Sequence, residues 1–278
     1  MSILVAKADG TSEAFEVSKL RSSLKRAGAE KGAIEQISAE IEKGLYNGIS
    51  TSEIYRRAFA RLREHRGVAA RYSLKRAVLE FGPSGFPFEV YLAELFRAQG
   101  YSAATDQIIQ GACVEHEVDV VVRPKAGKVA SPIIYVEAKF HNTIGFKTDL
   151  KTVLYVKARI DDIRATTTDP VQGLVVTNTK FTEKAVQYST CAGLDLLGWE
   201  YPAKNNLHDR VVAARLYPIT ALTSLSKREK TALLNENKVL CNALRADGEV
   251  LERVGIRGRR ADAVLEEVGA LCVPGKDI

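Results

Sequence analysis

Two acidic residues and one lysine lie in the middle of the chain, in segments that otherwise suit buried β-strands. Asp119 interrupts the apolar run 117–122, and Glu137 and Lys139 come near the end of the run 133–140. Because side chains alternate along a strand, Glu137 and Lys139 share a face, and Asp119 approaches Glu137 if the segments pair as a hairpin. Two carboxylates suit a hard cation such as Mg²⁺, and a nearby lysine can orient or deprotonate an attacking water. The chemistry that this set serves is metal-assisted hydrolysis of a phosphodiester.

An ion pair across the edge of a solvated sheet is the other interpretation of these three residues. The spacing D…E-x-K is short and is not specific by itself. Two observations favour the catalytic interpretation. An unpaired charge inside an apolar strand is costly, and the helical segment upstream carries a further acid, Glu89.

The elements that position these residues follow from the apolar pattern between residues 85 and 203. A Gly/Pro cluster at 82–85 separates this region from the one before it. The pattern predicts, in order, a helix over 88–98, strands over 101–109, 117–122 and 133–140, a helix over 149–163, a strand over 173–177, a helix over 182–191 and a strand over 194–199. This αβββαβαβ order predicts a mixed sheet with helices on both faces.

The flanking regions have different patterns. Segments 3–7 and 14–17 are predicted as strands joined at Asp9-Gly10, a strong hairpin signal. Helical stripes follow over 20–27, 34–41 and 54–62, then a helix over 68–81. From about Leu207 the chain is helical and basic, with a capping box at Ser226 and Glu229. We see no internal repeat. A multi-domain α+β and α/β protein is expected, with domains 1–84, 85–203 and 204–278.

Composition excludes several classes of protein. The 278 residues are 46% hydrophobic and 27% charged, which is typical of a globular chain of about two domains. No apolar run reaches the ~20 residues of a membrane span, and the apolar start at 3–6 is too short for a signal peptide. The 4 cysteines lie far apart without a C-x-x-C, so neither a disulfide framework nor a zinc ribbon is predicted. We expect a cytoplasmic protein with reduced thiols and no membrane partner.

The net charge of +6 is unevenly distributed along the chain. Residues 1–84 carry 15 basic and 10 acidic side chains, residues 85–203 carry 12 and 14, and residues 204–278 carry 13 and 10. An acidic centre between basic flanks suits a metal-dependent site on a protein that approaches a polyphosphate. An unevenly charged solvated surface is the alternative.

Several positions of the central region match those of a known group of nucleases. They are Phe88-Glu89, Phe96, Gly100-Tyr101, Val118-Asp119-Val120 and Val136-Glu137-Ala138-Lys139. Over about residues 85–200 the chain resembles the PD-(D/E)xK superfamily, especially Mrr-type restriction endonucleases and archaeal Holliday junction resolvases. The resemblance implies a restriction-endonuclease-like αβββαβ core that cleaves DNA with Mg²⁺ or Mn²⁺.

The same resemblance implies a role for each matched residue. Asp119 and Glu137 correspond to metal ligands, and Lys139 to the catalytic lysine. Glu89 corresponds to a helix-borne acid that supports the metal or its water, and Glu94 is an alternative for that role. The chain departs from the literal motif at Val118, which stands where proline is usual.

A second resemblance covers about residues 3–80. It is carried by residues 5–10, Phe15, Lys19-Leu20, residues 48–55 and Ala70-Arg71-Tyr72. These positions are similar to the ATP-cone, a small β lid on a helical bundle that binds ATP or dATP in ribonucleotide reductases and their repressor. The residues implied to line the nucleotide are Val5, Lys7, Glu13, Lys19, Leu20 and Thr51. Ala8 stands where a second basic residue is common, and a bundle that serves oligomerisation without binding nucleotide is the alternative.

The C-terminal region contains Gly255-Ile256-Arg257-Gly258 between two helical patterns. This segment resembles a helix-hairpin-helix loop, which brings backbone N–H groups to a DNA phosphate. The spacing is one residue off the usual G-x-G form, and an ordinary helical packing module is the alternative.

These observations together predict a Mg²⁺-dependent DNA endonuclease under allosteric control by ATP or dATP. No P-loop is present, so the nucleotide is expected to be an effector. Control is expected through DNA access or the state of a homo-oligomer. The alternative is a nucleotide-responsive DNA-binding regulator whose nuclease fold is inert.

Overall fold

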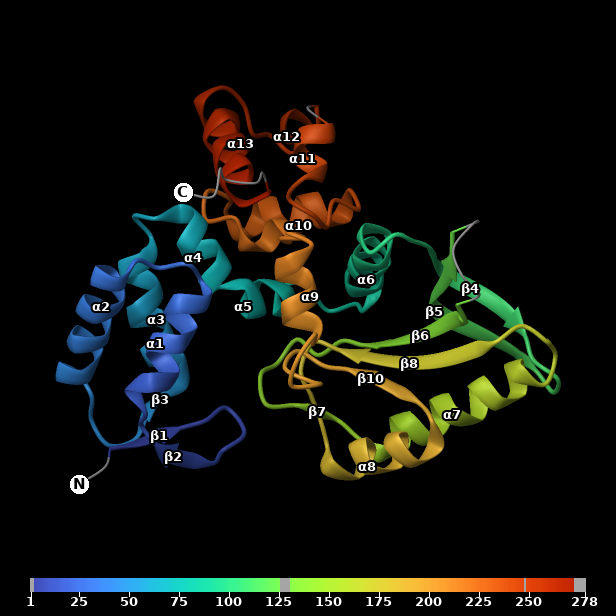
Figure 1. Ribbon diagram of the computed structural model, residues 1–278. Coiled ribbons are helices and arrows are strands. Elements are labelled where there is room, and N and C mark those ends of the chain that lie inside the picture. Colours follow the sequence, from blue (N-terminus) through green and yellow to red (C-terminus); the bar gives the residue numbers. More distant parts are fainter. Residues whose placement is uncertain (1–2, 126–130, 248, 273–278) are drawn as a thin grey trace. The chain divides into compact units, whose positions relative to one another are not determined.

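The structure is a computed structural model that describes residues 3–125, 131–247 and 249–272. It contains two compact units (Figure 1). The first comprises the residues up to Ala77 together with those from Tyr217 onward, and the second comprises Val78–Leu216. Within the described residues, no helix combines the length and apolar composition that crossing a membrane requires.

The second unit is built on a five-stranded mixed sheet with strand order β10-β8-β6-β5-β4. The antiparallel part pairs β4 with β5 and β5 with β6, whereas β6, β8 and β10 run parallel. The strands are β4 (Tyr101–Gln110), β5 (Glu115–Pro124), β6 (Ile133–Lys139), β8 (Val171–Thr177) and β10 (Asp195–Leu197). The short strands β7 (Lys147–Thr148) and β9 (Lys180–Phe181) pair separately in parallel. Parallel pairing requires crossovers, and helices provide them.

Helices cover both faces of this sheet (Figure 1). Helix α6 (Phe86–Ala98) packs on β4 and β5, whereas α7 (Leu150–Arg164) packs on β8 and on α8 (Glu183–Ala192). Gly173 of β8 allows the close approach of α7, because a Cβ there would lie 2.7 Å from Cγ1 of Ile160. The side chains of Asp149 and Thr182 cap α7 and α8 by accepting a bond from the backbone N–H three residues on. Helix α9 (Leu207–Ala213) ends the unit.

The first unit has a small sheet and two groups of helices. Strand β1 (Leu4–Ala6) pairs antiparallel with β2 (Ser12–Ala14) and parallel with β3 (Ile49–Ser50). The N-terminal helices are α1 (Val17–Arg26), α2 (Lys31–Lys43), α3 (Thr51–Leu62), α4 (Arg66–Tyr72) and α5 (Leu74–Leu79), the last of which crosses into the second unit. Ser50 caps α3 through the Glu53 N–H, as the sequence predicts. Buried aliphatic residues of β1, β3 and α1–α3 form one core.

Helices are the main elements of the C-terminal part of the first unit, where Pro218 and Leu240 also form an isolated antiparallel β-bridge. This part comprises the 3₁₀ turn η1 (Ile219–Ala221) and helices α10 (Lys227–Asn235), α11 (Ala243–Ala246), α12 (Val250–Arg253) and α13 (Arg259–Cys272). Helix α13 packs against α4 and α11. The predicted capping box is present, since Ser226 and Glu229 bond to each other's backbone N–H groups.

The predicted fold class is confirmed, with a small sheet on helices, a mixed central sheet and a helical C-terminal region. Two predicted elements were wrong in detail. The second strand lies at 12–14 rather than 14–17, because Val17 begins α1, whose Leu20 and Leu24 are buried at helical spacing. The helix predicted over 68–81 is two helices separated at Ser73, whose hydroxyl bonds to the Ala70 carbonyl. The three domains 1–84, 85–203 and 204–278 stay a prediction.

Candidate active site

The pairing of β5 with β6 brings the two predicted metal ligands to facing positions. Val120 lies opposite Val136 in the antiparallel pairing of the two strands. One step further along, the facing positions are Asp119 and Glu137. The Ala138 backbone N–H donates a hydrogen bond of 2.6 Å to Oδ2 of Asp119. The two carboxylates therefore lie side by side, which is the arrangement that the strand pattern predicts.

Glu137 is a buried carboxylate between two cations. Its side chain is only 5% exposed, and its Oε1 lies 2.5 Å from Nζ of Lys139. Its Oε2 accepts a short hydrogen bond from Nη1 of Arg159. The Lys139 side chain is 38% exposed, against 10% for Arg159, so Lys139 is the cation that a molecule arriving from solvent can reach.

Asp119 and Glu89 are electrostatically coupled acids. Burial and the charge of Glu137 raise the pKa of Asp119 to about 6, despite the opposing Ala138 N–H, Lys139 and Arg159. Burial and then the charge of Asp119 raise the pKa of Glu89 to about 7. Glu89 lies in the first turn of α6, which packs on β5. Burial and neighbouring negative charge therefore favour the protonated form of both carboxyl groups.

Glu94, the alternative helix-borne acid, is engaged elsewhere. Its Oε1 lies 2.5 Å from Nη1 of Arg97, and Arg97 also donates to the Ala103 carbonyl. Of the two acids on α6, the structure associates Glu89 with Asp119.

Buried polar residues at the end of β8 and directly after it fix the end of β6. Thr177 Oγ1 donates to the Lys139 carbonyl over 2.8 Å. Asn178 accepts from the His141 N–H and donates to the His141 carbonyl. Because Thr177 and Asn178 are buried, they are positioned to hold the strand that carries Lys139 and not to contact a ligand in solvent. The His141 ring stacks on Phe146, and burial, with Lys139 nearby, lowers the pKa of His141.

Arg159 and Tyr155 of α7 are part of this site, and the sequence reasoning missed both. Nη2 of Arg159 donates a 2.7 Å hydrogen bond to the Tyr155 hydroxyl, and the guanidinium carbon lies 4.7 Å from the centre of the Tyr155 ring. An arginine four residues after a tyrosine on a helix is an ordinary surface pattern. Only the packing of α7 on the sheet turns Arg159 toward Glu137.

The donor set fits Mg²⁺ or Mn²⁺. Mg²⁺ binds proteins through one or two carboxylates and takes its other ligands from water or substrate phosphate, and Asp119 and Glu137 offer that number. Within the described residues, no group of three or more His, Cys, Asp or Glu side chains forms a metal cluster. The two carboxylates thus fit an ion that completes its coordination with water and substrate.

Three family models match successive parts of the chain. Residues 3–78 match the ATP cone domain, residues 83–198 match a restriction endonuclease domain of the Mrr type, and residues 217–272 match the AF1548-like C-terminal domain. An uncharacterized protein of Archaeoglobus fulgidus is 34% identical over 177 residues, which are 63% of this chain and 97% of that protein. The chain belongs to the AF1548 family.

Among solved structures, AF1548 itself is similar to this chain. The crystal structure of AF1548, a protein of unknown function, is 32% identical with a TM-score of 0.55, covering 66% of this chain and 96% of that one. A repair endonuclease from Pyrococcus abyssi is 24% identical with a TM-score of 0.32, covering 41% of this chain and 46% of that one. The predicted ATP-cone and Mrr-type nuclease domains of this AF1548-family chain are both confirmed.

The residues implied to bind nucleotide fall into two groups. Lys7 and Lys19 both contact Glu13, with Nζ to Oε2 distances of 2.6 and 3.4 Å, and the hydrogen bond from Lys7 is the main cause that lowers the pKa of Glu13. Thr51 is exposed in the first turn of α3. Val5 and Leu20, in contrast, are buried in the core beneath. The charged group is therefore the part of this set that solvent reaches.

Two other side chains of the second unit, His116 and Trp199, make structural contacts. His116 bonds through Nε2 to Oδ2 of Asp162 over 2.8 Å and so lies outside the group around Glu137. Trp199 is buried and packs edge-on against His208. Neither residue is grouped with the nuclease candidates.

Proposed function

We propose that this chain is a Mg²⁺- or Mn²⁺-dependent DNA endonuclease whose activity is controlled by ATP or dATP bound to the ATP-cone. The observation that carries the nuclease proposal is the convergence of Asp119, Glu137 and Lys139 at adjoining strand positions of an Mrr-type domain. Asp119 and Glu89 speak against an inert nuclease fold, because burial raises the pKa of both and an inert fold has no chemical reason to keep two such acids there.

Each side chain has a distinct proposed role. Asp119 and Glu137 would hold the metal ion, which supplies a polarised phosphate oxygen and an acidified water when bound. Lys139, as the exposed cation beside Glu137, orients the attacking water and stabilises negative charge that develops on the phosphate. Glu89, whose pKa of about 7 leaves it able to exchange a proton near neutral pH, accepts or supplies a proton at the water.

Arg159 is a positioning residue in this scheme. It touches Glu137 and Tyr155 and is nearly buried, so it acts on the reaction only through the orientation of Glu137. Groups that orient a metal ligand in this way typically contribute 10- to 100-fold to metal affinity or activity.

The nuclease proposal is tested by Asp119→Ala and Lys139→Ala in the full chain. With supercoiled plasmid and Mg²⁺ or Mn²⁺, we expect each variant to lose at least about 100-fold in nicking rate, because each removes a group that acts in the transition state. Asp161→Asn is the matched control, since Asp161 lies on α7 with a half-exposed side chain and pairs with Lys157 and Arg164.

Cleavage at the wild-type rate by either alanine variant would contradict the assignment. A wild-type chain that binds plasmid but never cuts it, with any divalent metal and with or without ATP, would instead support the inert regulator. Circular dichroism of both variants checks that folding is retained.

A further inference from the structure

The C-terminal helices present a group of exposed basic side chains that the proposed active site does not use. These residues are Lys227, Arg228, Arg257, Arg259 and Arg260, here called the basic turn surface. They belong to two turns, one at the start of α10 and one at the start of α13. Over residues 226–231 and 257–262 there are 6 basic and 2 acidic side chains, so both turns are positively charged.

The two turns have the same pattern of burial, repeated after 31 positions. Leu225 and Ile256 are buried aliphatic residues just before the turns, and Leu233 and Val264 are buried on the helices that follow. Arg228 and Arg259 occupy equivalent exposed positions between them. Few identical residues connect the two segments, which is why the sequence alone shows no repeat.

Contacts between the two segments join equivalent positions. Glu229 and Arg260 are equivalent under the same spacing, and Nη1 of Arg260 lies 2.9 Å from Oε1 of Glu229. A contact between a residue and its own counterpart is what an approximate two-fold axis produces. The starts of α10 and α13 therefore lie next to each other, and this one contact between equivalent positions fits an approximately symmetric pair.

A buried carboxylate makes this arrangement rigid. Glu267 of α13 is 2% exposed and accepts hydrogen bonds from the Thr223 N–H, the Thr223 hydroxyl and the Ser224 N–H. It holds the segment that leads into α10, while Arg260 and Glu229 form a partly exposed ion pair between the starts of α13 and α10. The backbone that carries the basic side chains is thus already ordered, and binding a ligand needs little further ordering of it.

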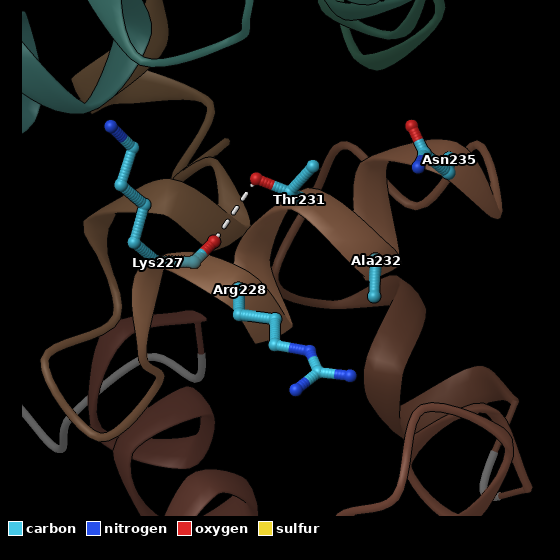
Figure 2. A pocket seen from close by; sticks show the side chains of 5 residues that line it. All are labelled: Lys227, Arg228, Thr231, Ala232 and Asn235. Carbon is cyan, nitrogen blue, oxygen red and sulfur yellow. Dashed lines mark hydrogen bonds between the residues drawn. The ribbon is translucent and has the colours of Figure 1, made fainter.

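An open pocket adjoins the first turn (Figure 2). It has a volume of about 600 Å³ and is lined by Lys227, Arg228, Thr231, Ala232 and Asn235 of α10. The Thr231 hydroxyl donates to the Lys227 carbonyl, which leaves the two cations as the charged groups of the pocket. Cations with hydroxyl and amide groups beside them are the side chains that contact phosphate and sugar in nucleic-acid complexes.

We propose that the basic turn surface binds the phosphate backbones of double-stranded DNA. The two strands of a duplex are related by local two-fold axes, and a symmetric pair of basic turns can contact one backbone with each turn. A single strand has no such symmetry. The contacts involve charge and not base edges, so the expected binding is independent of sequence.

This proposal rests on the proposed function only in taking DNA as the substrate. The basic turn surface lies in the first unit and the candidate active site in the second. Each of the two proposals can therefore be wrong without the other being wrong. Its role is to raise the concentration of duplex available to the nuclease unit, which is an effect on binding and not on the chemical step.

The test compares duplex binding by full-length variants that cannot cleave. In an Asp119→Ala background, Arg228→Glu/Arg259→Glu alters the two equivalent positions, and Lys31→Glu/Lys43→Glu makes the same charge change at exposed sites on α2. Fluorescence anisotropy with a labelled duplex is measured over a range of salt concentrations. We expect the first pair to weaken binding at least tenfold and to reduce the salt slope by about 2, as loss of two phosphate contacts predicts. The control pair should change affinity less than twofold.

Three outcomes would overturn the proposal. They are duplex affinity unchanged in the first pair, an equal loss in the control pair, and a larger loss for a single-stranded probe than for the duplex. Arg228→Gln/Arg259→Gln gives a milder change if the charge reversal unfolds the chain. Cleavage by the wild type is scored separately, so an absent nuclease activity leaves the binding result interpretable.

Discussion

The Glu137 carboxylate depends on two cations of different character. Lys139 is partly exposed, so a substrate can reach it, whereas Arg159 is almost completely buried. Nε of Arg159 has no hydrogen-bond partner within the described residues, so Glu137 and Tyr155 alone orient its guanidinium. Removing one member of a buried ion pair leaves the other charge uncompensated, which is more costly than the pair itself is stabilising.

We therefore predict that Arg159→Met lowers the free energy of unfolding by about 3 kcal/mol, because it removes the more buried of the two cations that the buried Glu137 contacts. Cleavage should fall about 10- to 100-fold, together with Mn²⁺ affinity measured by calorimetry in the absence of DNA. Arg159→Lys should recover part of the stability. It keeps the positive charge but loses the planar guanidinium, whose two Nη atoms contact Glu137 and Tyr155. A methionine variant with wild-type stability and Mn²⁺ affinity would show that Arg159 does not position Glu137.

Some of these residues could be predicted from the sequence and others could not, and the reason is physical. Asp119 and Glu137 are visible because an acid inside an apolar strand needs an explanation. Arg159 is invisible because an arginine on an amphipathic helix is normally solvated, and its direction depends on how α7 packs against the sheet. Val5 and Leu20 are a different case. The resemblance to the ATP-cone implies that they line the nucleotide, but it does not predict that both side chains are buried.

At the scale of elements, one side chain of α7 ties the tip of the β4–β5 hairpin to the helix. Asp162 accepts hydrogen bonds from the Cys113 N–H at 2.9 Å, the Val114 N–H at 3.3 Å and Nε2 of His116 at 2.8 Å. Gly111 makes room for it, because a Cβ there would collide with the Asp162 carboxylate. Strand β5 carries Asp119, so this tie helps to fix one wall of the candidate active site.

The tie is predicted to weaken in acid. The hydrogen bond from His116, with those from Cys113 and Val114, lowers the pKa of Asp162 to about 2 from the usual value near 4. A depressed pKa contributes stability that is complete above the unfolded value and is lost as pH falls through the folded one. Asp162→Asn should therefore lower the unfolding midpoint at pH 7, and its difference from wild type should shrink between about pH 4 and pH 2.

Calorimetric melts of both chains over that range measure the effect. Asp161→Asn provides the control, because its partners are on the solvent side of α7. A midpoint difference that stays constant down to pH 2 would mean that the Asp162 carboxylate charge does not stabilise the hairpin.

The order of elements in the second unit was predictable because the apolar residues of each strand and each helix repeat at the spacing of that element. The prediction failed where a local bond competes with that period. Val17 favours a strand by type but begins α1, and Ser73 divides a continuous helical pattern into α4 and α5. The two-residue strands β7 and β9 have too few residues for any period, so only their pairing in space defines them.

At the scale of the whole chain, two candidate binding surfaces belong to one compact unit. The charged group Lys7, Glu13 and Lys19 and the basic turn surface both lie in the first unit, and the candidate nuclease residues lie in the second. Helix α13, which follows the second basic turn, packs on α4 of the ATP-cone. Packed helices therefore connect the ATP-cone to the helix that follows the second basic turn.

We predict that this nucleotide response depends on the two lysines. ATP or dATP at 100 times its dissociation constant should stabilise the wild-type chain by about 2.7 kcal/mol, because it binds only the folded state. Lys7→Ala/Lys19→Ala removes both charges that can meet the phosphates and should abolish the shift in unfolding midpoint, whereas Lys25→Ala/Arg26→Ala at the end of α1 should keep it. The lysine variant should also cut plasmid at one rate with or without ATP, and light scattering should show an oligomeric state that no longer responds to ATP. An unchanged thermal shift in the Lys7/Lys19 variant would place the nucleotide elsewhere. If the Lys7/Lys19 variant loses the thermal shift but its cleavage still responds to ATP, nucleotide binding to the ATP-cone does not control the nuclease.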